Sequence, residues 1–158
     1  MTLIECVPNF SEGRDRTKIK RITDAIEATA GVTLLNVEPG ADTHRTVVTF
    51  VGTPEGALQA AFSAIATAAQ VIDMRTHSGA HPRIGATDVC PFVPVEGVTM
   101  EDCAEIARRL GERVGRELGI PVYLYEAAAT RPERRNLADI RRGEYEGLKK
   151  EITLPGRA

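Results

Sequence analysis

The segment His77–Pro82 contains the residues best suited to acid–base chemistry. It holds two of the three histidines of the chain, His77 and His81. Imidazole titrates near neutral pH, so it can both take up and release a proton during a reaction. Pro82 favours an extended backbone at His81, and Gly79 permits close approach of another chain segment. This geometry suits a general base at His81, but the pattern alone fits a surface or structural loop histidine equally well, and both interpretations stay open at this point.

The spacing of these two histidines also raises the question of a metal site. His77 and His81 are four residues apart, which is the spacing of a metal-binding pair on a helix. The glycine between them and the proline after them disfavour a helix here. Asp73 or Asp88 could add a third ligand, but neither spacing is a recognised one. The sequence therefore predicts no metal site.

Charged residues flank a predicted turn earlier in the chain. Glu38 ends one strand-like run, and Arg45 begins the next. A carboxylate here could orient an imidazole, and the arginine could bind a substrate carboxylate through two hydrogen bonds. A solvated turn with an ordinary ion pair is the alternative. A basic stretch at 131–142 could meet a polyanionic ligand or form a solvated helix face.

Composition narrows the class of protein. A chain of 158 residues suits one domain with one core, and its net charge of −2 argues against general nucleic-acid binding. The cysteines, Cys6, Cys90 and Cys103, show no metal or CxxC spacing, which is typical of small buried side chains in a reduced cytosol. Neither a signal peptide nor a membrane-length apolar run is visible, so we expect a cytoplasmic protein without membrane contact.

Apolar periodicity predicts the elements that must position these residues. Strands are expected at 3–7, 32–38, 45–52, 87–93 and 121–125. Helices are expected through 19–26, over 54–72 after the Thr53-Pro54 start, and over 100–118 between a Thr99/Asp102 capping box and Gly119. We expect a polar turn at 9–13, a loop at 73–86, a loop with short helices at 126–148, and a tail at 149–158.

The order of these elements predicts the fold class. β-α-β-β-α-β followed by α-β matches an α+β, ferredoxin-like split β-α-β sandwich. We expect a mixed sheet, with a purely antiparallel one as the alternative, and helices on one face. The other face must then be covered or serve as a binding surface. Residues 1–148 form the predicted domain.

Five blocks of sequence resemble one known family, and they occur in the family's order over nearly the whole chain. The chain is similar to the N-terminal subdomain of the glutamate formimidoyltransferase (formiminotransferase) family. The blocks are Glu5–Gly13, Arg45–Gly52, His81–Phe92, Pro121–Tyr125 and Ile140–Glu146.

This resemblance implies a reaction and a site. The family transfers a formimino group from N-formimino-L-glutamate to N5 of tetrahydrofolate, a co-substrate, in histidine degradation, without a metal. It implies that His81 is the catalytic histidine and general base. Glu38 stands where the family usually has aspartate, and His44 where asparagine is common. The substrate-binding residues that we expect are Asn9, Glu38, Arg45, Arg83 and Asp88.

Family transferases continue into a second subdomain that supplies much of the folate site. We therefore expect 149–158 to lead to such a subdomain, supplied in cis or in trans, and we expect a homodimer. Two alternatives stay open: a non-catalytic folate-binding or regulatory subdomain, and an interaction module that uses the uncovered sheet face.

Overall fold

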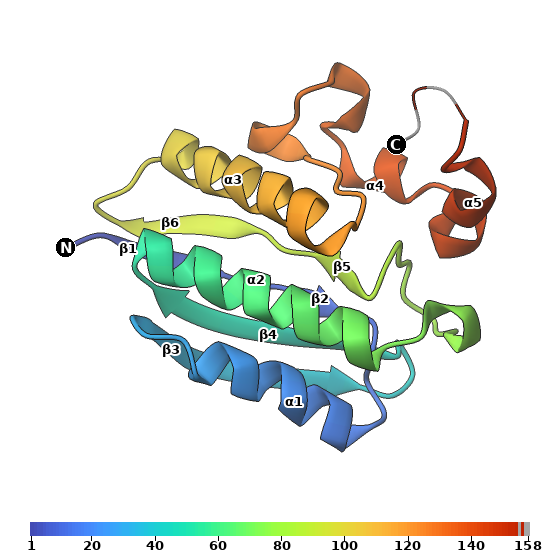
Figure 1. The fold of residues 1–158 in the computed structure, drawn as a ribbon, viewed down its shortest axis with the longest axis horizontal. Helices are drawn as coiled ribbons and strands as arrows, with labels where there is room; N and C mark the ends of the chain where they lie inside the picture. The colour runs from blue at the N-terminus through green and yellow to red at the C-terminus, as the bar shows by residue number, and fades with distance from the viewer. Residues whose placement is uncertain (155, 157–158) are drawn as a thin grey trace.

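One antiparallel sheet with three long helices on a single face organises the chain (Figure 1). The computed structural model describes residues 1–154 and Gly156. The strands are β1 (Leu3–Cys6), β2 (Asn9–Phe10), β3 (Val32–Gly40), β4 (Arg45–Gly52), β5 (Thr87–Val89) and β6 (Phe92–Glu96). The α-helices are α1 (Arg16–Glu27), α2 (Pro54–Val71), α3 (Met100–Leu118), α4 (Leu137–Arg141) and α5 (Glu144–Glu151). Short 3₁₀ turns are η1 (Met74–Thr76), η2 (Glu126–Ala128) and η3 (Pro132–Arg134).

The sheet runs in the order β5-β2-β4-β1-β6, and β3 pairs with the free side of β4. β1 and β2 are consecutive pieces that both pair with β4, while β6 and β5 pair with β1 and β2. All pairings between the described strands are antiparallel. The expectation of a mixed sheet is therefore wrong, and the antiparallel alternative describes the sheet.

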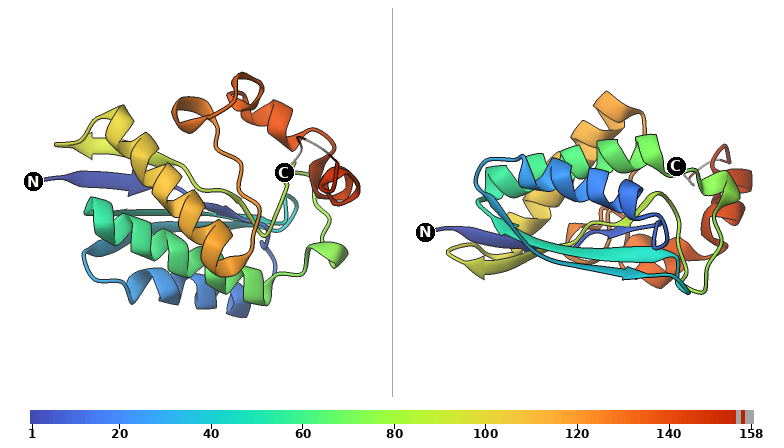
Figure 2. Two further views of the ribbon diagram at one scale, coloured as in Figure 1. Left: turned by 45° about the horizontal axis from the view of Figure 1, so that its top comes forward. Right: turned by 90° about the horizontal axis from the view of Figure 1, so that it is seen from below.

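The helix layer matches the prediction that helices cover one face (Figure 2). Along β4 every second residue is buried, and Thr46, Val48 and Phe50 point toward the helices. Burying a side chain such as Phe50 contributes about 1.5–3 kcal/mol. The predicted helix ends are confirmed: the Thr53 hydroxyl accepts from Gly56 N–H, Thr99 and Asp102 form a capping box, and Gly119 is left-handed.

Two predicted boundaries around the sheet are wrong because strands break where proline intervenes. The expected turn at 9–13 begins with β2, which resumes the pairing of β1 after Val7-Pro8 and buries Phe10. The strand expected over 87–93 is two strands, β5 and β6. The chain leaves the ladder at Cys90-Pro91, where Pro91 has no N–H to donate.

The strand predicted over 121–125 is absent from the structure. This segment lies outside the sheet and packs over α3, where Val122 and Leu124 contact the side-chain-free surface of Gly111. The alternate apolar side chains of this segment therefore pack against α3, and the segment does not pair with a strand. The short helices expected within 126–148 are confirmed, and α5 extends into the predicted tail as far as Glu151. Among the described residues, no helix is both long and apolar enough to cross a membrane.

Candidate active site

The loop that carries His81 is fastened to the turn between β3 and β4. Ala80 N–H donates to the Asp42 carbonyl at 3.1 Å. A Cβ atom at Gly79 would lie 2.8 Å from His44 Cβ and closer still to the Thr43 carbonyl oxygen. Only glycine fits this approach, so Gly79, two residues before His81, allows the loop to pack against the β3–β4 turn.

Arg45, Asn9 and His81 form the centre of the site. Arg45, the first residue of β4, uses its Nη1 to donate to Asn9 Oδ1 at 3.0 Å and contacts His81 Nε2 at 3.0 Å. A guanidinium can only donate, so His81 Nε2 is the acceptor and carries no proton. Three of the residues named from the sequence, on three separate segments, thus contact one another.

The surroundings of His81 favour its neutral form. Burial lowers the pKa of His81, and the positive charges of Arg45 and then Arg141 lower it further. The carboxylate of Asp88 opposes this shift to a smaller extent. A neutral imidazole at pH 7 is the state that a general base requires.

Arg83, expected to bind substrate, is a buried clamp instead of a free cation. Its side chain is only 7% exposed. It donates from Nε to His77 Nδ1 at 2.9 Å and from Nη2 to the His77 carbonyl at 2.8 Å. Its terminal nitrogens also pair with Glu144 at 3.2 Å and with Glu146 at 2.7 Å. Arg83 therefore ties the His81 loop to α5.

His77 and His44, to which the sequence assigned no role in the site, connect the His81 loop to the β3–β4 turn. His77 donates from Nε2 to the His44 carbonyl at 2.8 Å, and the two rings stack 4.2 Å apart. His44 has φ 51°, in the left-handed region, and its Nδ1 accepts from Gly13 N–H at 3.0 Å. Burial and then the neighbouring His77 lower the pKa of His44, while Glu12 opposes the shift.

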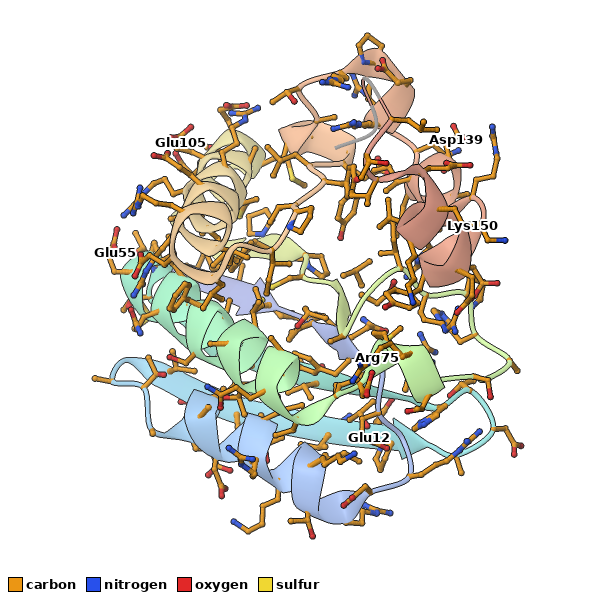
Figure 3. The ribbon with its side chains drawn as sticks, turned by 45° about the vertical axis from the view of Figure 1, so that its right-hand side comes forward. Glu12, Glu55, Arg75, Glu105, Asp139 and Lys150 are labelled. Carbon is orange, nitrogen blue, oxygen red and sulfur yellow. The ribbon has the colours of Figure 1, made fainter. Side chains whose placement is uncertain are left out.

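Glu12 is a buried carboxylate that sequence reasoning also missed (Figure 3). It lies 3.6 Å from His44 Nδ1 and accepts from the backbone N–H groups of Arg14 and Asp15 at 3.1 and 3.0 Å. Its position just before the Asp15 N-cap of α1 explains both bonds. The only sequence feature that pointed to Glu12 was its place in the Glu5–Gly13 block.

Asp88, also expected to bind substrate, has both carboxylate oxygens engaged. Oδ1 accepts from Ile84 N–H at 2.6 Å, and Oδ2 pairs with Arg141 Nη2. The Asp88 side chain is 4% exposed. Within the described part of the chain, buried Arg141 Nε has no acceptor. Asp88 thus holds Arg141 close enough to His81 for its positive charge to act on the imidazole.

Glu38 hydrogen-bonds to Asn36 within β3 rather than to the His81 imidazole. It pairs with Val47, as Asn9 does from the other side, so both side chains are on the sheet face opposite the helices. Glu38 Oε1 accepts from Asn36 Nδ2 at 2.8 Å. In residues 1–154 and Gly156 no hydrogen bond or ion pair joins Glu38 to His81.

An apolar cavity of about 390 Å³ adjoins this site. It lies between α3, the 84–92 segment and residues 120–128. Asp88 lines both this cavity and the small pocket around His81. No group of three or more metal-ligating side chains occurs among the residues that the structure describes.

The sequence profile described as "Formiminotransferase domain, N-terminal subdomain" matches residues 3–157. The chain belongs to this family. It is 54% identical over 150 residues to the formimidoyltransferase-cyclodeaminase of Dictyostelium discoideum, covering 95% of this chain and 28% of that protein. It is 54% identical over 154 residues to the glutamate formimidoyltransferase of Thermoplasma acidophilum (strain ATCC 25905 / DSM 1728 / JCM 9062 / NBRC 15155 / AMRC-C165), covering 96% of this chain and 51% of that protein. The glutamate formimidoyltransferase of Streptococcus pyogenes serotype M1 is 47% identical over 150 residues, with 95% and 50% covered.

The family match covers the elements that build the site. β2, β4, the His81 loop, β5 and α5 all lie within the matched residues. The chain spans about half the length of the formimidoyltransferases it matches and 28% of the bifunctional relative. The named reaction therefore belongs to longer proteins of which this formiminotransferase subdomain corresponds to one part.

Proposed function

We propose that this subdomain supplies the general base of a glutamate formimidoyltransferase. The reaction moves the formimino group from N-formimino-L-glutamate to N5 of tetrahydrofolate. The observation that carries the proposal is the unprotonated His81 Nε2 held beside Arg45 and Asn9 in a member of the formiminotransferase family. Tetrahydrofolate acts as co-substrate, and the proposed chemistry requires no metal.

The proton transfers fit one imidazole. N5 of the folate attacks the amidine carbon and forms a new C–N bond, and its proton passes to His81 Nε2. The bond to the glutamate nitrogen then breaks, and His81 returns the proton to that nitrogen. A single group with a pKa below its usual value can perform both steps near pH 7.

Arg45 controls when His81 Nε2 is available. In the structure its Nη1 hydrogen points at that lone pair. N-formimino-L-glutamate carries carboxylates, and a carboxylate is a stronger acceptor for guanidinium than an imidazole is. Substrate binding would draw Arg45 away and free Nε2 for the folate proton. Arg141, with its unmatched donor, is the second cation near His81 and would favour the same anion.

The finer fold class is also a proposal. The connection β-α-β-β-α-β, with β1/β2 and β6/β5 each acting as one strand, supports the ferredoxin-like split β-α-β class. In that description α3 and the 119–151 segment are an extension that carries Glu144, Glu146 and Arg141 to the site.

We propose that a second subdomain covers the sheet face opposite the helices. Val93 and Val95 on β6 are 41% and 50% exposed, and Val93 lies on that face as the partner of Glu5. Asn9, Arg45 and Glu38 also lie there. A partner on this face would bury the apolar side chains and close the site from water. Homodimer formation is part of this proposal.

A cytoplasmic location completes the proposal. All three cysteines of the chain are unpaired, and unpaired thiols suit a reducing compartment.

The test is a transfer assay on the full-length protein. Formation of formiminotetrahydrofolate is measured with wild type, with His81→Ala and with Arg75→Ala, an exposed control on η1. We expect His81→Ala to lower kcat by about 10²–10⁴ while tetrahydrofolate binding by calorimetry is retained, and Arg75→Ala to be unchanged. Absent turnover in wild type, or equal turnover in His81→Ala, contradicts the proposal. Folate binding without turnover would favour the non-catalytic alternative.

A further inference from the structure

Two thiols lie close together, one at the end of β1 and one in the break between β5 and β6. Cys6 Sγ and Cys90 Sγ are 3.6 Å apart although 84 residues separate them in the chain. Cys6 is fully buried, and Cys90 is partly exposed. The third cysteine, Cys103, is buried on α3 and has no such sulfur contact within the described residues. The mechanism proposed above uses none of these sulfurs.

The backbone holds the two sulfurs in register. Cys6 is the last residue of β1 and pairs with Phe92, and Cys90 lies in the break between β5 and β6. Val7 N–H donates to the Pro91 carbonyl at 3.2 Å, which joins the two segments at this point. A disulfide has an S–S length of about 2.0 Å. Closing the bond therefore requires the sulfurs to approach by roughly 1.6 Å, through rotation of the side chains and a shift of the strand break.

We propose that Cys6 and Cys90 form a redox modification site that a hydroperoxide closes to a disulfide. The Cys90 sulfur attacks one oxygen of the peroxide bond, which gives a sulfenic acid at Cys90 and, from hydrogen peroxide, one water. The Cys6 sulfur then displaces the sulfenic hydroxyl, which leaves as a second water. Both thiols lose a proton and an electron, and the peroxide is the species reduced.

The surroundings assign different roles to the two cysteines. Burial raises the pKa of Cys6 well above its usual value, and its hydrogen bond to Cys90 raises it further, so Cys6 stays a thiol. Cys90 is partly exposed and lines the apolar cavity of about 390 Å³, through which a small peroxide reaches it. Cys90 is therefore oxidised first, and Cys6 resolves the sulfenic acid.

The bond would join two segments that also carry residues of the proposed site. Cys90 follows Asp88 by two residues, and Asn9 follows Cys6 by three. Drawing the strand break toward β1 moves Asp88 relative to its Ile84 and Arg141 partners. We expect the oxidised protein to lose transfer activity at least about 10-fold and to regain it with dithiothreitol. This expected loss rests on the proposed function, while formation of the bond does not.

The test is oxidation of the reduced full-length protein with hydrogen peroxide, followed by trypsin digestion without reductant and mass spectrometry. Cys6 falls in the peptide 1–14, but the peptide 84–108 contains both Cys90 and Cys103. The Cys103→Ser variant removes this ambiguity and is the background for the experiment. We expect a linked pair of these two peptides that dithiothreitol separates. Peroxide that leaves Cys90 unmodified, or carries it to the sulfinic acid without linkage, overturns the proposal.

Two further variants assign the roles. In Cys6→Ala with Cys103→Ser we expect no linkage and a Cys90 sulfenic acid that dimedone traps. In Cys90→Ser with Cys103→Ser we expect neither product at Cys6. Direct oxidation of Cys6 in that variant would overturn the assigned order. Should either variant fail to fold, the linked peptides in Cys103→Ser alone decide the central point.

Discussion

Replacing Arg83 by methionine tests whether the buried clamp on the His81 loop contributes to stability. Methionine keeps an apolar stem of similar length and removes every hydrogen-bond donor. The arginine makes two bonds to His77 inside the protein and three to Glu144 and Glu146 at its edge. The two groups of bonds differ in burial, so they contribute different amounts to the free energy of unfolding.

The buried bonds dominate the expected cost. A hydrogen bond from a charged donor contributes about 1.5–3 kcal/mol, and we take about 1.5 for each bond to His77. Glu144 and Glu146 are 43% and 58% exposed, so solvent screens their ion pairs, and each contributes about 0.5 kcal/mol. Together these give about 4 kcal/mol. For a chain of this size that corresponds to a fall in Tm of roughly 8–16 °C.

Urea unfolding followed by circular dichroism measures the effect, with the m-value checked for constancy. Glu146→Gln is the matched control because it weakens only an exposed partner, and we expect a loss of about 0.5 kcal/mol from it. Equal losses for Arg83→Met and Glu146→Gln would refute the reasoning, because the bonds to His77 would then carry no weight.

Three further changes probe the same site. Arg45→Gln removes a positive charge that lowers the pKa of His81, so we expect this pKa to rise and the acid limb of the kcat/KM profile to move to higher pH. An acid limb that does not move would show that His81 does not set it. Gly79→Ala should cost about 1–3 kcal/mol because its Cβ meets the backbone at Thr43, whereas Gly147→Ala, in open space on α5, should be neutral or slightly stabilising in thermal melts. In urea titrations we expect the free energy of unfolding of His44→Asn to stay within about 0.5 kcal/mol of wild type, because Asn tolerates a left-handed backbone and can still accept from Gly13 N–H. His44→Ala should lose about 1–2 kcal/mol. The opposite ranking would count against this role of the His44 ring.

The helices and their ends were predictable because their determinants are local. The Thr53-Pro54 start, the Thr99/Asp102 capping box and the Gly119 stop each act within a few residues of themselves. The segment 121–125 shows the limit of this reasoning. Alternating apolar residues satisfy either a sheet or the groove of a helix, and only the position of Gly111 on α3 decides between them.

The composition of the site was predictable in part. His81, Arg45 and Asn9 were named from residue types and motif blocks, and the structure brings them together. The burial of Arg83 was not foreseeable, because its carboxylate partners lie 61 and 63 residues later in the chain. Glu38 and Asn9 lie on opposite sides of Val47 on β4. That placement depends on strand register, which residue spacing alone does not reveal.

The attachment of Arg83 to α5 also sets an order of events during synthesis. The sheet strands end at Glu96, but Glu146 follows Arg83 by 63 residues. At roughly 5–20 residues per second, a ribosome needs about 3–13 s to add that stretch. From the addition of Glu96 until that of Glu146, the nascent chain contains every strand of the sheet and a His81 loop without its outer anchor. The site therefore becomes ordered late, after the scaffold around it has been made.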